Sequence, residues 1–323
     1  MRKNKKNSLA FRRKIPVAGC FDVVVCGGGP AGFSAAAAAA RAGMNTLLIE
    51  RFNCLGGAGT VGLVGPFAPT DGTNGGVYRE ILQRLAAEKS LKSSWYYRIP
   101  NCFDAETYKY AAQTLCEEAG VRFLFDTMVS DVIMRRREIE GVVVANKGGL
   151  QAVFGQVTID ATGDGDIAWM AGAPYEKGDR KGRCQPTTFF FNIGGIRPVK
   201  LTARDVLNIK RAYRRALREG AIHLPRHMDN IWSWTDFIGE GSTIRAAETS
   251  INIDMTSGMD GTDPEALSKA EAEGRRQAWE CLRFFRKNIP GAEKAYITQT
   301  NLLYGLRETR RIRGEYYLTK ADI

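Results

Sequence analysis

A glycine-rich turn between a valine-rich segment and an alanine-rich segment constrains the fold of this chain more than any other feature. Three valines at positions 23–25 precede the glycine-rich turn at 27–32, and alanines dominate positions 34–42. This order predicts a strand, a tight turn and a helix. A second apolar run at 46–49 ends in an acid, Glu50. An acid about twenty residues beyond such glycines is typical of a dinucleotide-binding fingerprint.

The residues of this fingerprint have separate physical roles. Gly27 lets the chain turn sharply, Gly29 has no Cβ to block a pyrophosphate, and Gly32 lets the helix pack closely on the strand. The start of the helix offers unpaired N–H groups and the positive end of its dipole to phosphates. The Glu50 carboxylate would accept hydrogen bonds from both ribose hydroxyls. The alternative is a purely structural turn in another kind of α/β protein.

Length and charge limit the class of protein further. At 323 residues the chain is long enough for about two domains. Its formal net charge of +11 comes mostly from one end, because residues 1–14 contain seven Lys or Arg and no acid, which leaves +4 for the rest. We expect these 14 residues to form a disordered basic tail. Nucleic acid is therefore not an expected partner.

The cysteines and histidines give no sign of a metal site. The seven cysteines form no C-x-x-C pair and no zinc-type spacing, and their odd number favours a reducing compartment and a cytoplasmic location. His223 and His227 are separated by Pro225, which breaks the helix that a metal pair would need. No stretch approaches the ~18 apolar residues of a membrane span. We expect neither a metal nor a membrane span.

The rest of the first half predicts further elements of an α/β domain. A helix is expected at 77–87, and another at 105–118 with Asp104 as its N-cap and Gly120 at its end. Strands are expected at 121–125, 131–134, 141–145 and 153–159. The last three would form an antiparallel β-meander that leads back into the parallel sheet.

Two loops are expected near the cofactor. The strand at 153–159 ends in an acid followed by Ala-Thr-Gly, which places small residues at the carboxyl edge of the sheet. Calcium at the acids Asp160, Asp164 and Asp166 is disfavoured, because the glycines between them imply a turn and no Glu or His joins them. The glycine-rich stretch 51–76 either contacts the cofactor or packs on the domain face, and we favour cofactor contact.

From Gly172 onward the pattern indicates a second domain. Thr202 begins a capping box for a helix with one apolar face and one basic face, and the basic face is expected to be solvated. Asp263, followed by proline, begins a long helix that reaches Asn288. Gly274 is expected to interrupt this helix, since glycine is a poor helix former.

The last twenty residues hold an arginine cluster and an unusual end. Four arginines within residues 307–313 either clamp an anion or pair with Glu308 and Glu315. Residues 319–322 have the form of a capping box, but the chain stops inside the turn that it would begin. We therefore expect the sequence to be an amino-terminal part of a longer protein.

Taken together, these motifs resemble the FAD-dependent oxidoreductases of the glutathione-reductase-like superfamily, which has two dinucleotide-binding domains. The resemblance rests on DVVVCGGGPAG (22–32), LLIERFNCLGGAGT (47–60), IDATGDGDIAWMAGAP (159–174), QPTTFFFNIGG (185–195) and GLRETRRIRGEYYLT (305–319). These stretches span nearly the whole chain after the basic tail. The combination is specific for the family and says little about the substrate.

The resemblance implies a noncovalently bound FAD and assigns its contacts. The pyrophosphate would lie at Gly27, Gly29, Pro30, Ala31 and Gly32. The adenosine ribose would bind Glu50, the adenine would lie beside Arg51 and the backbone of Val129, and the floor of the adenosine pocket would be Ala161, Thr162 and Gly163. The flavin or ribityl part would lie along Gly56, Gly57 and Thr60. Family members complete this site with a carboxyl-terminal segment that is missing after Ile323. A partner cysteine four or five residues beyond Cys54 is absent, so disulfide reduction is not expected.

The expected fold is α/β, with a Rossmann-like FAD-binding domain (15–171), an inserted α+β cap or substrate domain (172–304) and a return segment (305–323). The expected activity is hydride transfer between a small organic substrate and the flavin, with an electron acceptor of unknown identity. Arg307 and Arg310 are candidate substrate contacts, and Cys54 is a candidate to face the isoalloxazine. Two alternatives stay open: an NAD-binding or thiazole-synthase-like enzyme without flavin, and a truncated, non-catalytic nucleotide-binding fragment. Oligomers are possible.

Overall fold

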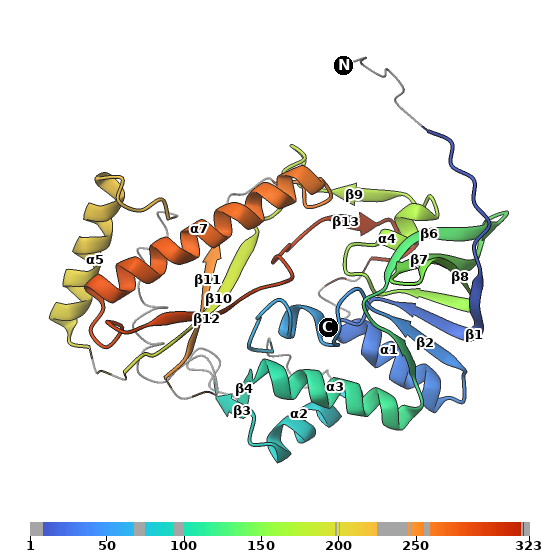
Figure 1. Ribbon diagram of the computed structural model, residues 1–323, viewed down its shortest axis with the longest axis horizontal. Helices are drawn as coiled ribbons and strands as arrows, with labels where there is room; N and C mark the ends of the chain where they lie inside the picture. The colour runs from blue at the N-terminus through green and yellow to red at the C-terminus, as the bar shows by residue number, and fades with distance from the viewer. Residues whose placement is uncertain are drawn as a thin grey trace.

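The computed structural model describes residues 9–67, 75–93, 100–197, 199, 201–224, 245, 247–254, 259–317 and 319. His227, one of the two histidines considered above, lies outside these residues. Figure 1 shows a six-stranded sheet at one end of an elongated molecule and a three-stranded sheet toward the other end.

The six-stranded sheet has the order β5-β2-β1-β8-β7-β6. Its central strand β1 (Val17–Cys26) pairs in parallel with β2 (Thr46–Ile49) and β8 (Gly149–Asp160), and β2 pairs in parallel with β5 (Arg122–Leu124). The antiparallel part consists of β6 (Met128–Arg135), β7 (Glu138–Asn146) and β8. The predicted parallel sheet with a β-meander is confirmed. β8 begins earlier than predicted, because pairing with β7 already starts where Gly149 lies opposite Asn146.

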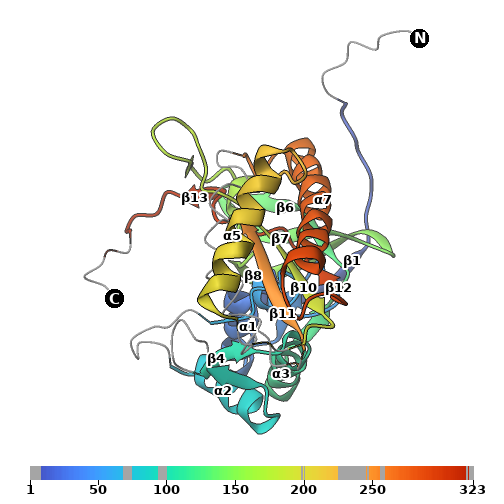
Figure 2. The same cartoon turned by 90° about the vertical axis from the view of Figure 1, so that its left-hand side faces the viewer.

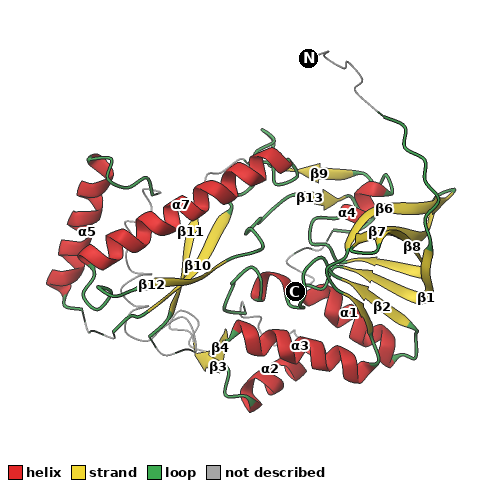
Figure 3. Cartoon of the chain, in the orientation of Figure 1, coloured by secondary structure: helices red, strands yellow, loops and turns green. Residues whose placement is uncertain are grey.

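Three helices, α1 (Pro30–Arg41), α2 (Val77–Ala87) and α3 (Ala105–Ala119), lie together beside this sheet (Figure 3). Their apolar side chains form one core with the residues of β1 that point toward them, Val23 and Val25. The alternate residue of β1, Val24, points to the other face and is buried with valines of the β-meander. The valine run is therefore buried on both faces, as expected for the central strand of a parallel sheet.

The three-stranded sheet has the order β11-β10-β12. Its central strand β10 (Thr188–Gly194) is antiparallel to both β11 (Thr249–Asp254) and β12 (Tyr296–Thr300). Two helices, α5 (Ala203–Arg218) and α7 (Pro264–Asn288), lie in front of this sheet in Figure 2. Every second residue of β10 enters the core beneath these helices, namely Phe189, Phe191 and Ile193.

The helices begin where the sequence supplies a cap. Asp104 accepts hydrogen bonds from two backbone N–H groups in the first turn of α3, both at 3.0 Å, and Gly120 follows that helix with a φ of 86°. Thr202 and Asp205 form the predicted capping box of α5. Asp263 caps α7, which has proline in its first turn. These caps depend on residues only two or three positions away, which explains why the sequence reveals them.

The prediction that Gly274 interrupts the long helix is wrong. α7 is one continuous helix of 25 residues, and Gly274 is buried in the middle of it. A Cβ at this position would lie 2.3 Å from Cδ2 of Phe189, so the glycine provides space for that ring. Among the helices of the described ranges, α7 included, none combines the length and the apolar character needed to cross a membrane.

Two short ladders, one turn of 3-10 helix and the short helix α4 (Asp166–Met170) complete the fold of the described ranges. β3 (Leu91–Ser93) pairs with β4 (Pro100–Phe103), and η1 (Gly57–Gly59) lies within a second glycine cluster, residues 56–59. β9 (Tyr175–Lys177) is antiparallel to β13 (Arg310–Ile312). The β9–β13 ladder joins the stretch that follows the first sheet to the stretch that returns from the second, as Figure 1 shows.

One ion pair beside this ladder predicts a pH-dependent stability. Burial alone would raise the pKa of Asp260, but hydrogen bonds from Lys177 and Thr262 outweigh it and lower that pKa from 3.8 to about 2. Because the pKa falls on folding, the ionised carboxylate stabilises the fold at pH values above the unfolded pKa. This contribution is lost as the pH falls from about 4 toward 2.

We expect wild type to be more stable than Asp260→Asn above pH 4, with the difference shrinking steadily toward pH 2. Urea unfolding of both proteins between pH 6 and pH 2 measures the difference in their unfolding free energies. A difference that stayed constant down to pH 2 would assign the stabilisation to something other than the charge of Asp260.

Candidate cofactor site

A cavity of about 330 Å³ lies at the carboxyl edge of the six-stranded sheet. The segments that follow β1, β2 and β8 all line it, because the carboxyl ends of parallel strands meet at one edge. Eleven of the fourteen residues expected to contact a cofactor line this cavity: Gly27, Gly29, Pro30, Ala31, Glu50, Arg51, Gly57, Val129, Ala161, Thr162 and Gly163. The structure thus brings together residues that are more than 130 positions apart.

The three fingerprint glycines occupy different surroundings. Gly27 has a φ of +105°, and a Cβ on it would lie 2.3 Å from the backbone oxygen of Ala161. A Cβ on Gly32 would lie 1.8 Å from the backbone oxygen of Gly27, which explains why Gly32 packs against the turn and does not line the cavity. A Cβ on Gly29 would meet no atom within 4 Å, although this residue is on the cavity wall.

Helix α1 begins at the cavity wall without a side-chain cap. Gly29 is its N-cap residue, and no side chain accepts a hydrogen bond from the first turn. The unpaired N–H groups and the positive end of the helix dipole at such a terminus favour an anion. With the open side of Gly29, they form a cradle that suits a phosphate group.

Glu50 joins the end of β2 to the glycine turn. Its Oε2 accepts a hydrogen bond from the backbone N–H of Gly28 at 2.5 Å, and its Oε1 accepts one from Phe52 at 2.9 Å. The side chain is buried but reaches the cavity wall. Each carboxylate oxygen can accept more than one hydrogen bond, so the acid retains capacity for ligand hydroxyls.

The second glycine cluster lies directly against the first. A Cβ on Gly57 would be 3.0 Å from Cα of Gly29. Gly56 takes the left-handed conformation, with a φ of 101°, and buried Thr60 donates to the backbone oxygen of Leu55 at 2.8 Å. Gly57 lines the cavity, whereas Gly56 and Thr60 shape the turn behind it. Six residues of the 51–76 stretch line the cavity: Arg51, Phe52, Gly57, Ala58, Gly62 and Val64. Residues 68–74 of it lie outside the described part.

The three candidate reactive residues do not line this cavity. Burial raises the pKa of the Cys54 thiol, and the nearest charged groups include Lys109 of α3. Arg307 donates to the hydroxyl of Thr188 at 3.0 Å, and Arg310 forms an ion pair with Asp166 at 2.7 Å. Within the arginine cluster, the predicted pairing with Glu308 is made by Arg311.

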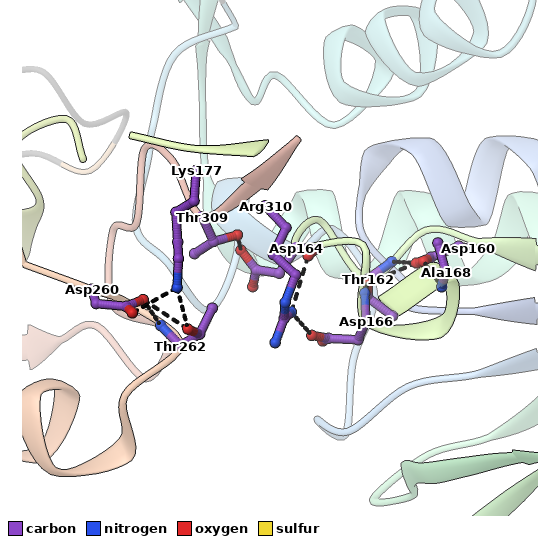
Figure 4. A network of polar contacts seen from close by, with 10 residues as sticks. All are labelled: Asp160, Thr162, Asp164, Asp166, Ala168, Lys177, Asp260, Thr262, Thr309 and Arg310. Atoms are coloured by element: carbon purple, nitrogen blue, oxygen red, sulfur yellow. Dashed lines mark hydrogen bonds and ion pairs between the residues drawn. The ribbon is translucent and has the colours of Figure 1, made fainter. Parts of the chain in front are cut away.

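The three acids of the 160–166 stretch bind separate donors, as Figure 4 shows. Asp160 accepts from the hydroxyl of Thr162 at 2.7 Å, Asp164 from Thr309 at 2.5 Å, and Asp166 from Arg310 at 2.7 Å. They do not converge on one point, and no cluster of metal-binding side chains occurs in the described ranges. Each carboxylate has a hydrogen-bond or ion-pair partner within the chain.

Residues 303–306, which follow β12, line the cavity and were not predicted to do so. They form one wall with Ala58, Gly62 and Val64 of the 51–76 stretch, for which cofactor contact was expected. The two segments are joined by hydrogen bonds from the backbone N–H groups of Leu302 and Leu303 to the backbone oxygen of Val61, at 2.8 and 3.2 Å. Gly305 and Leu306 belong to the 305–319 stretch of the resemblance, but no pattern indicates that residues 303–306 line the cavity, because their position depends on a contact between distant segments. Leu303 and Leu306 make this wall apolar, whereas Glu50, Arg51 and Thr162 bring polar groups to other parts of the lining.

The fold and the cavity define a class: an α/β protein that holds a dinucleotide at the carboxyl edge of a parallel sheet. The chain belongs to the FAD dependent oxidoreductase family, whose model matches residues 22–323. FAD is therefore its cofactor, and the uncapped helix start and open Gly29 fit the pyrophosphate of that group.

Curated relatives match parts of the chain. The thiamine thiazole synthase of Aeropyrum pernix is 36% identical over 144 residues, which are 44% of this chain and 50% of that protein. The tRNA uridine 5-carboxymethylaminomethyl modification enzyme MnmG of Dichelobacter nodosus is 31% identical over 180 residues, 50% of this chain and 27% of that one. The chain thus spans about half the length, or less, of these relatives.

Solved structures show the fold. The flavin-dependent brominase Bmp2 aligns over 91% of this chain and 68% of its own, with a TM-score of 0.51 and 15% identity. The myxobacterial chondrochloren halogenase CndH aligns over 88% of this chain and 65% of its own, with a TM-score of 0.50 and 13% identity. The predicted class, a Rossmann-like FAD-binding unit with a further α+β unit, is confirmed.

Proposed function

We propose that this chain binds FAD noncovalently in the cavity and transfers hydride between a small organic substrate and the flavin. The observation that carries the proposal is the convergence of the two glycine clusters, Glu50 and the Ala-Thr-Gly segment on one cavity. These come from the ends of three strands and from η1. A purely structural turn would not require an open side at Gly29 or an uncapped helix start.

The FAD contacts follow from this arrangement. The pyrophosphate would lie on the open side of Gly29 and at Ala31, where α1 begins. Glu50 would hold the adenosine ribose, Arg51 would lie beside the adenine, and the backbone of Val129 would meet its edge. The floor of the adenosine pocket would be the 161–163 segment. Gly32, Gly56 and Thr60 would act indirectly, because they shape the turns that carry the contacting residues.

Bound FAD supplies the redox chemistry, and the chain binds, orients and shields it. We assign residues 15–171 to an FAD-binding domain, 172–304 to an inserted substrate domain and 305–323 to a return segment, which is supported by the separate cores around β1 and β10. The apolar wall at Val64, Leu303 and Leu306 would exclude water beside the flavin ring. Cys54, Arg307 and Arg310 are not on the wall, and we assign none of them a catalytic role.

A cytoplasmic location fits the state of the cysteines. All seven are unpaired, and five are buried. Proteins of oxidising compartments tend to carry disulfides, whereas a reducing compartment keeps thiols free.

A second candidate function is supported by the local similarity to thiamine thiazole synthases, at 36% identity over 144 residues. In that reading the same fingerprint would hold a dinucleotide without flavin redox chemistry. A visible spectrum separates the two candidates, because only the flavin absorbs there.

The test is an absorption spectrum of the purified chain after incubation with excess FAD and removal of free ligand. We expect an oxidised-flavin band that bleaches when a substrate is added under anaerobic conditions. A folded protein that remains colourless, but binds NAD, contradicts the flavin proposal. A colourless protein that binds neither nucleotide favours the non-catalytic fragment.

A further inference from the structure

The 162–166 loop forms part of the cavity wall and has its own hydrogen bonds. The Thr162 hydroxyl donates to Asp160 at 2.7 Å and accepts from the backbone N–H of Asp166 at 3.0 Å. The other oxygen of Asp160 accepts from the backbone N–H of Ala168 at 3.0 Å. Thr162, Asp164 and Asp166 all line the cavity. The shape of the wall therefore depends on how these acids are held.

Two successive residues hold the loop from outside the cavity (Figure 4). Thr309 donates to Oδ1 of Asp164 at 2.5 Å, and Arg310 donates to Asp166 at 2.7 Å and to the backbone oxygen of Asp164 at 3.2 Å. The Arg310 side chain is 9% exposed and its guanidinium lies 4.4 Å from the ring centre of Trp169. Two hydrogen-bond acceptors and an aromatic ring together hold the planar guanidinium in one position.

The loop is linked to a distant turn through the β9–β13 ladder. Arg310 lies directly opposite Lys177, and two cations at such a position repel each other unless each has a counter-ion. Arg310 has Asp166, and Lys177 has Asp260 at 2.6 Å, with a further hydrogen bond to Thr262 at 3.0 Å. Two ion pairs whose cations lie side by side thus connect the cavity wall to the 260–262 turn, which precedes α7.

We propose that Thr309 and Arg310 are positioning residues for the cofactor cavity, and that the Lys177–Asp260 ion pair couples the 260–262 turn to them. The proposal rests on FAD binding at this cavity. Loss of Asp260 leaves Lys177 to repel Arg310, which weakens the hold of Arg310 on Asp166 and loosens the loop. Coupling between two sites is reciprocal, so FAD also steadies the 260–262 turn.

The test measures FAD dissociation constants by flavin fluorescence for wild type, Thr309→Val and Asp260→Asn. Neither Thr309 nor Asp260 lines the cavity. We expect each substitution to weaken FAD binding by about threefold to thirtyfold, the range expected for coupling through neighbouring residues. Arg310→Met should weaken binding more than Arg310→Lys, which keeps the charge beside Asp166.

Glu176→Gln is the matched control. Glu176 is on β9 next to Lys177, and it pairs with Arg311 and Arg313 at the surface, 3.9 and 3.3 Å away. Its loss should leave the FAD dissociation constant unchanged. If Asp260→Asn does not fold, Asp260→Ser provides a second variant that removes the counter-ion of Lys177. Lys177→Met also removes the cation that faces Arg310, so it should leave the FAD dissociation constant near the wild-type value.

Hydrogen exchange of the chain without FAD provides an independent readout. The backbone N–H groups of Asp166 and Ala168 should exchange faster in Thr309→Val and Asp260→Asn than in wild type or Glu176→Gln. If wild type does not bind FAD, the proposed function fails, and the exchange data alone decide this inference. Unchanged exchange, or an unchanged FAD dissociation constant in Thr309→Val and Asp260→Asn variants that are folded at the temperature and pH of the titration, overturns it.

Discussion

Gly29→Ala is expected to weaken FAD binding by about 30-fold or more, about 2 kcal/mol, while the chain stays folded. The added methyl group meets no protein atom within 4 Å, and the backbone angles at Gly29, −66° and −177°, suit any residue. The expected loss of stability, from a poorer N-cap, is at most about 1 kcal/mol. The methyl group would occupy the space that a pyrophosphate needs beside α1. Flavin fluorescence titration and thermal unfolding measure the two effects separately.

Gly32→Ala is the matched variant, for which we expect a large loss of stability. Its methyl group would lie 1.8 Å from the backbone oxygen of Gly27, so one of the two backbone segments would have to shift. We expect a loss of stability of about 3 kcal/mol or more, at the upper end for overpacked sites. If Gly29→Ala bound FAD like wild type, the pyrophosphate would have to lie elsewhere. If Gly32→Ala were as stable as wild type, the result would contradict the close packing of α1 against the backbone of Gly27.

Gly274→Ala is expected to destabilise the protein, although alanine is the better helix former by about 1 kcal/mol. The methyl group would lie 2.3 Å from Cδ2 and 2.5 Å from Cγ of Phe189, a fully buried ring. Overpacking of this kind costs about 1–3 kcal/mol of stability. We expect this cost to outweigh the gain in helix propensity from alanine. Urea unfolding of wild type and variant measures the difference in unfolding free energy.

A double-mutant cycle with Phe189→Leu isolates this contact. Phe189→Leu alone leaves a cavity beside Gly274 and should destabilise the fold, but the methyl group of Gly274→Ala should then be tolerated. The double variant is therefore expected to be more stable than the two single effects predict. Additive effects would show that the methyl group at position 274 does not clash with the Phe189 ring.

Several features follow from local sequence and were predicted from it. The glycine turn, the start of α1 and the acid at the end of β2 lie within thirty consecutive residues, and each depends on backbone geometry that only certain residues allow. The caps at Asp104, Thr202 and Asp263 are equally local. Eleven expected contact residues line one cavity because parallel strands must present their carboxyl ends at the same edge.

Other features depend on contacts between distant parts of the chain. The local sequence predicts that Gly274 interrupts a helix. In the structure this glycine makes room for the Phe189 ring, which is 85 positions earlier in the chain. The arginine cluster allowed two readings, and the ion pair of Arg310 with Asp166 arises only when β13 returns to the first sheet. The place of residues 303–306 in the cavity wall has no local sequence signal, although Gly305 and Leu306 begin one of the stretches that carry the family resemblance.

The βαβ fingerprint, three helix caps and the class of cofactor could be predicted from the sequence, because they depend on residues close together in the chain. The side chains that meet across the cavity and the arginines that form ion pairs became evident only in the folded chain. Packing and charge pairing depend on distances in space, and residues such as Asp164 and Thr309 are neighbours only after folding.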